Sequence, residues 1–207
     1  MKRFIIYHLL LTLCVSIFNS CSLVRDPLES YSDVSEGESQ SGQQIVFKDR
    51  ASVDNYLNSL YQQLRDRQEH WYLDLLLIAE SHADNAYAGT TGAEVVPFEN
   101  NSIEGSNSVV DRDWSRYLED VARANRLVIF VDSVADNSLS PALIKSYKAQ
   151  AKIFRALVLF DMVRIFGSIP VVTTVAPDIT GENVSEVYPQ YFPKQSTEEE
   201  AYRQIEK

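Results

Sequence analysis

Residues Lys145–Val172, KSYKAQAKIFRALVLFDMVRIFGSIPVV, decide the fold that we predict for this chain. A helix is expected to start where Ser140 precedes Pro141, because serine caps helix N-termini and proline is favoured at the first helical position. Gly167 and Pro170 are expected to end it. Apolar side chains recur at helical spacing in two stripes, which predicts neighbouring helices on two sides. The stripes consist of Tyr147, Ala151, Phe154, Val158, Met162 and Ile165, and of Ile153, Ala156, Leu157, Phe160 and Val163.

Three charged residues interrupt these apolar stripes and allow two interpretations. Asp161 and Arg164 are one helical turn apart, a spacing that gives ordinary ion pairs. Arg155 lies almost two turns before Asp161, so we expect it to meet another helix. A buried catalytic pair is the alternative, but the stretch offers no nucleophile or second carboxylate beside it. The sequence therefore favours a helix inside a stacked array, with these charges fastening helices together, and no catalytic residue.

Length and composition fit a globular protein of one domain or part of a larger one. The 207 residues are 45% hydrophobic and 23% charged, with 29 acidic against 19 basic residues and a net charge of -10. A nucleic-acid groove needs clustered lysine and arginine, and no block of five basic residues occurs. The composition thus excludes a nucleic-acid partner.

Residues 1–20 have the pattern of a secretory signal peptide, with two basic residues followed by the apolar run Phe4–Phe18. Small Ser20 precedes Cys21, as lipoprotein processing requires, so we predict that the Cys21 thiol carries the lipid anchor. The alternative is an ordinary signal peptide with an incidental cysteine. Residues 21–44 are rich in serine, glutamate and glutamine, and are expected to be a flexible tether to the membrane.

The remaining residues, 45–207, show further helical patterns that predict an all-α antiparallel array. A helix is expected to begin near Ala51, because apolar residues follow at offsets typical of one helical face. Trp71–Ala79 is expected to be helical, with a buried strand left open. Asp113 is expected to cap a third helix, and Ser196–Glu199 has the pattern of a capping box. Because the chain ends inside this last helix, we expect the sequence to be a truncated piece.

Between these helices, the stretch from His82 to Asp113 lacks periodicity and contains three of the seven glycines. Long loops of this kind are uncommon unless they bind something or are disordered. The loop combines aromatic rings with amides and a carboxylate, which is how proteins hold sugars. The candidate ligand-binding residues are Asp84, Asn85, Tyr87, Phe98, Asn100 and Asn101. In the alternative interpretation, the two aromatic residues only pin the loop to the helices.

Motifs for catalysis, metal binding or cofactor binding are absent from the sequence. No H-E-x-x-H, C-x-x-C, G-x-S-x-G, G-x-G-x-x-G or P-loop pattern occurs. Glu80, His82 and Asp84 alternate and could gather three metal ligands if that stretch were extended, but a polar loop edge is the favoured interpretation. We therefore predict no enzyme activity, no cofactor and no metal.

Taken together, these segments resemble the start of the SusD/RagB-like nutrient-binding lipoproteins of Bacteroidetes outer membranes. The most specific match is Tyr147–Val172, which follows the family's pattern Y-x-x-x-A-x-x-x-R-A-x-x-x-F-x-x-x-x-x-F-G-x-I-P closely. The other matching segments are Cys21, ASVDNYLNSLYQQL (51–64), HADNAYAG (82–89), W-x-x-Y-x-x-x-x-A-R-A-N-R (114–126) and PKQSTEEEAYRQI (193–205). The resemblance covers nearly all of the mature chain but only the N-terminal part of the family's usual length.

The resemblance implies a scaffold of tetratricopeptide-like helical pairs with long irregular loops. It also implies that the protein packs on a SusC-like TonB-dependent transporter in the outer membrane and presents a glycan or peptide to it without chemistry. The family's ligand surface draws partly on the loop corresponding to Asp84–Asp113. No tryptophan lies in this loop, so the aromatic platform of the starch-binding members is not evident. The alternatives are a structural lid or adaptor without its own ligand, and a secreted hydrolase, which has the least support.

Overall fold

The structure, a computed structural model, describes residues 47–87, 89 and 91–207, all within one unit, Ser41–Lys207. The predicted signal peptide (1–20), the lipid site at Cys21 and the whole of the predicted tether (21–44) lie outside the described residues. Every regular element in the described residues is helical. The elements are α2 (Arg50–Asp66), η2 (Glu69–Asp74), η3 (Leu77–Ser81), α3 (Val96–Glu99), α4 (Ser108–Phe130), η4 (Val131–Ser133), α5 (Pro141–Phe166), α6 (Val184–Val187), η5 (Tyr188–Tyr191) and α7 (Glu198–Ile205). The predicted all-α class is confirmed.

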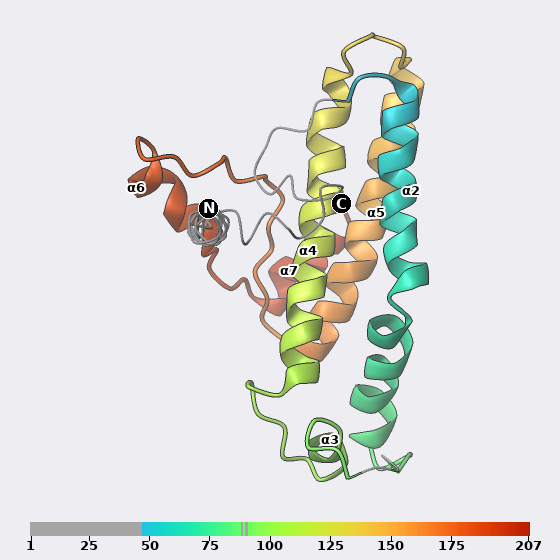
Figure 1. The fold of residues 1–207 in the computed structure, drawn as a ribbon, viewed down its shortest axis with the longest axis vertical. Coiled ribbons are helices and arrows are strands. Elements are labelled where there is room, and N and C mark those ends of the chain that lie inside the picture. Colours follow the sequence, from blue (N-terminus) through green and yellow to red (C-terminus); the bar gives the residue numbers. More distant parts are fainter. Residues whose placement is uncertain (1–46, 88, 90) are drawn as a thin grey trace, which may run out of the picture. The chain divides into compact units, whose positions relative to one another are not determined.

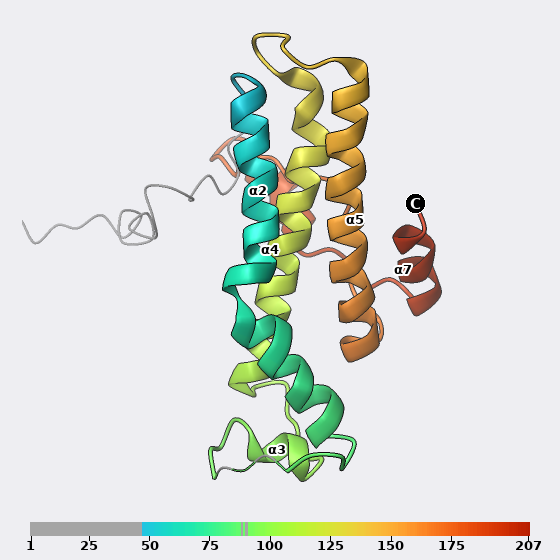
Figure 2. The same ribbon diagram turned by 90° about the vertical axis from the view of Figure 1, so that its right-hand side faces the viewer.

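Three long helices form the centre of the molecule. In Figures 1 and 2, α2, α4 and α5 lie side by side, and successive helices run in opposite directions. The short helix α7 packs on the far side of α5. No helix in the described part of the chain is long and apolar enough to cross a membrane.

Local capping chemistry sets the helix boundaries, and some differ from those predicted. The Ser140 hydroxyl accepts from the Leu143 N–H, so α5 begins where the sequence indicated. The predicted cap at Asp113 is wrong, because the Asn107 side chain accepts from the backbone N–H of Val109 and starts α4 earlier. The loop therefore ends at Asn107, and Asp113 lies inside the helix.

The last helix is also capped differently from the prediction. Its capping box pairs Thr197 with Glu200, one residue after the predicted Ser196–Glu199. The Thr197 hydroxyl accepts from the Glu200 N–H, and the Glu200 carboxylate accepts from the Thr197 N–H.

The first apolar stripe of α5 lies in the core, whereas the second does not. Val158 and Met162 from the first stripe are fully buried between α5 and its neighbours. In the second stripe, Ile153 is 71% exposed, Leu157 42% and Phe160 40%. Helix α7 covers only part of that face, so the predicted burial on two sides is wrong for most of the second stripe within the described residues.

Of the three charges in α5, Arg155 fastens helices together, as one of the two interpretations proposed, whereas Asp161 and Arg164 pair with each other within α5 at 3.4 Å. The Arg155 guanidinium, 6% exposed, donates to the Asn125 side-chain oxygen on α4 at 2.6 Å. The Asn125 amide in turn donates to the Val172 carbonyl at 2.8 Å and to the Thr174 carbonyl at 3.4 Å. Burial lowers the pKa of Arg155. This chain of bonds joins α4, α5 and the extended segment after α5.

The segment predicted as helical over Trp71–Ala79 is helical but contains two π-helical turns, η2 and η3. We call residues 69–81 the π-helical arm. Its outward side chains include Tyr72, which is 67% exposed, and its inward side chains include fully buried His70. The arm continues from α2 and ends beside α3, as Figure 2 shows. A buried strand, the alternative that the sequence left open, is excluded.

Candidate functional site

The six predicted ligand residues differ sharply in exposure. Tyr87 is 79% exposed, so it does not pin the loop to the helices. Phe98 is 1% exposed and packs into the interior from α3, so it serves as the anchor that the alternative interpretation described. Asp84, Asn85, Asn100 and Asn101 are all exposed. Five of the six predicted residues are therefore accessible to a ligand, and Phe98 is not.

Hydrogen bonds to the end of the π-helical arm shape the first half of the loop. The Asn85 backbone N–H donates to the Glu80 carbonyl at 2.9 Å, and the Asn85 side-chain amide donates to the Glu80 carboxylate at 3.3 Å. Asp84 has a φ of 63° and Asn101 has a φ of 53°, a left-handed conformation that short polar residues tolerate. Because α3 packs against η3, both halves of the loop lie at the same end of the molecule.

The second half of the loop contains a depression of about 460 Å³ that the sequence did not indicate. Its lining residues are Ala93, Glu94, Pro97, Ser102, Glu104, Ser106, Asn107 and Ser108. Asn107 shapes it, because its amide donates to the Glu94 carbonyl at 2.9 Å while its oxygen caps α4. None of the six predicted residues lines this depression, although Asn100 and Asn101 lie in the same loop. Hydroxyl and carboxylate groups around a concave surface are suited to sugar hydroxyls.

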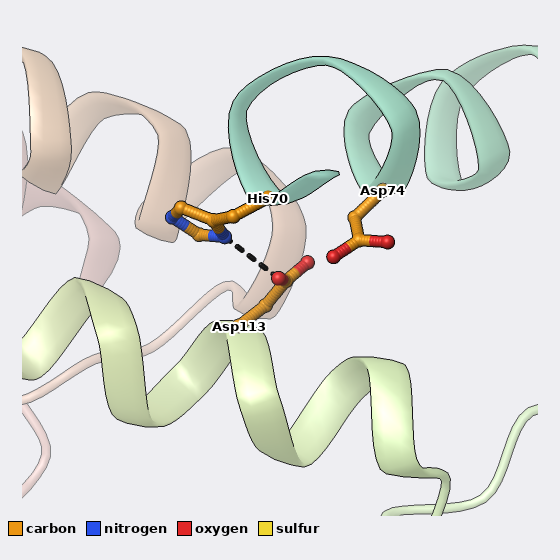
Figure 3. Close-up of side chains that lie close together, drawn as sticks. All are labelled: His70, Asp74 and Asp113. Carbon is orange, nitrogen blue, oxygen red and sulfur yellow. Dashed lines mark hydrogen bonds and ion pairs between the residues drawn. The ribbon is translucent and has the colours of Figure 1, made fainter. Parts of the chain in front are cut away.

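A second polar group is buried between the π-helical arm and α4. Figure 3 shows His70 and Asp74, both on η2, facing Asp113 on α4. The His70 Nδ1 and Asp113 Oδ1 atoms are 2.6 Å apart, and the three side chains are 0%, 1% and 0% exposed. The Arg112 guanidinium donates to both Asp74 oxygens, at 2.8 and 2.7 Å. These contacts join the arm to α4.

Buried carboxylates continue along α4 from this group. Asp120 is fully buried, and burial raises its pKa to about 6 although Arg67 lies 3.4 Å from it. Burial also raises the pKa of Asp74, against the opposing effect of Arg112. The Tyr117 hydroxyl, which has no hydrogen-bond partner within the described structure, has a pKa raised by burial and by the surrounding carboxylates. The buried region along α4 therefore contains the carboxyl groups of Asp74, Asp113 and Asp120.

This buried group was not predicted from the sequence, although one signal for it was present. Asp113 and Asp120 fall at helical spacing with the buried residues Tyr117, Val121 and Ala124, so both carboxylates belong to the core-facing side of α4. The metal site that the sequence offered as an alternative consisted of other residues. Glu80, His82 and Asp84 are exposed, and the described residues do not bring them together as possible ligands.

Comparison with known proteins gives a family and a fold. The chain matches the family model of SusD-like proteins, described as starch-binding and associating with the outer membrane, over residues 30–207. A crystal structure of a SusD-like protein from Bacteroides fragilis NCTC 9343 at 2.70 Å resolution is similar, with a TM-score of 0.56 and 22% sequence identity. The alignment covers 76% of this chain and 28% of that protein. The comparison with curated proteins gives no match. Because the family model covers most of the sequence, the chain belongs to the SusD-like family.

Proposed function

We propose that this protein captures an oligosaccharide at the outer membrane and delivers it to a TonB-dependent transporter, without catalysis. The observation that carries the proposal is the match to a family described as starch-binding and associating with the outer membrane. The chain spans only 28% of the length of the solved SusD-like protein, so the activity of a whole protein of that length is part of the proposal.

The loop at the end of the π-helical arm is the proposed ligand surface. Tyr87 presents its ring to solvent, and sugars bind by stacking a ring face on an aromatic side chain. Exposed Asp84, Asn85 and Asn101 supply the carboxylate and amide groups that hold sugar hydroxyls. Phe98 supports this surface from inside the fold. A peptide is the second ligand class that such polar and aromatic groups can bind.

Replacing Tyr87 with alanine is expected to weaken binding of a maltooligosaccharide about tenfold, because the stacking surface is lost. Isothermal titration calorimetry with maltoheptaose measures the effect, and a glycan array extends it to other sugars. Tyr72→Ala is the matched control, since Tyr72 is also exposed and lies on the arm but outside the loop. Unchanged affinity in Tyr87→Ala would show that the loop assignment is wrong.

A structural adaptor without its own ligand is the second candidate function. It is favoured by the apolar outer face of the π-helical arm, where Tyr72, Leu73 and Leu76 are 67%, 53% and 56% exposed. Exposed apolar patches of this kind often mark protein contacts. An adaptor would show no saturable binding on the glycan array while co-purifying with a large β-barrel after gentle extraction.

Attachment to the membrane is proposed to run through a lipid on Cys21. The supporting observation is the apolar run Phe4–Phe18 followed by Ser20 and Cys21. Incorporation of radiolabelled palmitate is expected to disappear in Cys21→Ala, because acylation needs that thiol, and to persist in Cys14→Ala. Labelling that survives the Cys21 substitution would contradict the anchor.

A further inference from the structure

The buried group of His70, Asp74 and Asp113 places one possible metal ligand from each residue within 4.8 Å of the other two. His70 and Asp74 lie four residues apart in one π-helical turn, and Asp113 faces both from α4 (Figure 3). The three residues come from two separate helices, so the arrangement depends on the tertiary fold. Nothing in the proposed glycan site uses any of these residues.

Two atoms in this group, His70 Nε2 and Asp113 Oδ2, are buried without a hydrogen-bond partner within the described structure. The Asp113 Oδ1 atom contacts the His70 Nδ1 atom, but Asp113 Oδ2 has no hydrogen-bond partner within the described structure. Asp113 is 0% exposed, so that oxygen has no contact with bulk solvent. In Figure 3 the second Asp113 oxygen points toward the Asp74 carboxylate. Two buried carboxylates that face each other repel unless a proton or a cation lies between them.

The nearby arginine does not supply that charge to both carboxylates. Arg112 donates to both oxygens of Asp74 and lies 3.4 Å from exposed Glu69, so it neutralises the outer side of the group. Asp113 instead contacts His70, with its Oδ1 atom 2.6 Å from the ring Nδ1 atom. A carboxylate has about four lone-pair sites, so Asp74 can accept from Arg112 and still bind a metal ion through a remaining lone pair. Outer hydrogen bonds of this kind commonly orient metal-binding carboxylates.

The ligand atoms of the three residues indicate which class of metal ion the group would bind. One imidazole nitrogen with carboxylate oxygens is typical of zinc and its transition-metal neighbours. Calcium and magnesium instead prefer ligand sets made of oxygen alone. Binding through Nδ1 uses the lone pair of that nitrogen, so the ring proton would have to lie on the other nitrogen.

We propose that His70, Asp74 and Asp113 form a binding site for one zinc-class divalent metal ion, which joins the π-helical arm to α4. The metal would bind His70 through Nδ1, because in Figure 3 the other ring nitrogen points away from the carboxylates. It would bind Asp113 through the unpartnered Oδ2 and Asp74 through one oxygen, with Arg112 retained as the outer partner. The site does not depend on the identity of the glycan or on its binding.

Calorimetric titration of zinc chloride into chelator-treated protein tests the site, with magnesium and calcium chloride as comparisons. One zinc ion is expected to bind per chain, and Asp113→Asn is expected to weaken it at least about 100-fold. Asp111→Asn is the matched control, since Asp111 is exposed on the same helix. His82→Ala removes the exposed histidine of the loop and is expected to leave zinc affinity unchanged. Absence of saturable zinc binding by the wild-type protein would overturn the proposal.

A second measurement separates metal binding from misfolding of the variants. In a long-range ¹H–¹⁵N spectrum of the wild-type protein, zinc is expected to shift the His70 Nδ1 resonance. If zinc shifts only His82, or if Asp113→Asn binds zinc as tightly as the wild type, the site is wrong. Asp74→Asn gives an independent loss of affinity where Asp113→Asn does not fold.

Discussion

Replacing Asn125 with alanine is expected to lower the free energy of unfolding by about 3–5 kcal/mol, because the substitution leaves a buried charge without its partner. The Arg155 guanidinium would lose the acceptor 2.6 Å away, and the Val172 carbonyl would lose its donor. Urea unfolding followed by circular dichroism measures the change. Asn58→Ala is the control, since Asn58 is exposed on α2 and its replacement is expected to change stability by less than about 0.5 kcal/mol.

Asn125→Asp separates the two contributions to this loss of stability, which are the bond from Arg155 and the bond to the Val172 carbonyl. The aspartate would keep an acceptor for Arg155 and add an opposite charge, but it would donate nothing to the Val172 carbonyl. Its destabilisation is expected to lie between that of the wild type and that of Asn125→Ala. If Asn125→Ala costs less than about 1 kcal/mol, Asn125 is not the fastener between α4 and α5.

Replacing Asp120 with asparagine is expected to stabilise the protein near neutral pH and to have little benefit near pH 4. Burial raises the pKa of Asp120 to about 6 in the folded state, against about 3.9 for an unfolded chain. The folded protein thus holds this proton more tightly, and the resulting stability is present below pH 4 and is lost as the pH rises through 6. The difference between the folded and unfolded pKa values corresponds to about 2–3 kcal/mol in the free energy of unfolding.

Urea unfolding of the wild type and Asp120→Asn between pH 4 and pH 8 measures this effect. The free energy of unfolding of Asp120→Asn, relative to that of the wild type, is expected to increase by about 2 kcal/mol from pH 4 to pH 8. Arg67 keeps its contact with Glu119 at 2.7 Å in the variant, so the substitution does not leave the guanidinium unpaired. A pH-independent difference for Asp120→Asn would contradict the prediction.

Features that depend on neighbours in the sequence were predicted well. The start of α5 follows from Ser140 and Pro141, and its end follows from Gly167, which has a φ of 71° that favours glycine. The contact of Arg155 with another helix also followed from its place in an apolar helix. These features depend only on the conformational preferences of neighbouring residues and on the 3.6-residue period of an α-helix.

Features set by distant contacts were not predicted. Phe98 carries the same aromatic character as Tyr87, and only the packing of α3 shows that Phe98 is buried while Tyr87 is exposed. The pairing of His70 with Asp113 spans 43 residues and needs α4 to run back along the arm. Asn107 was missed as a cap because Asp113, nearer the apolar stripe, has equal capping ability.

The π-helical turns of the arm also affect how this part of the chain tolerates changes in length. An α-helix turns by about 100° per residue, so removing one residue from a packed helix rotates everything beyond it out of register. A π-helical turn already holds an additional residue, since its hydrogen bonds span five residues rather than four. Deleting an outward residue such as Leu73 can convert η2 to ordinary α-helix, which would keep the arm helical while turning His70 relative to Asp74. Removing one residue from the arm would therefore change both the length of the arm and the orientation of His70 relative to Asp74.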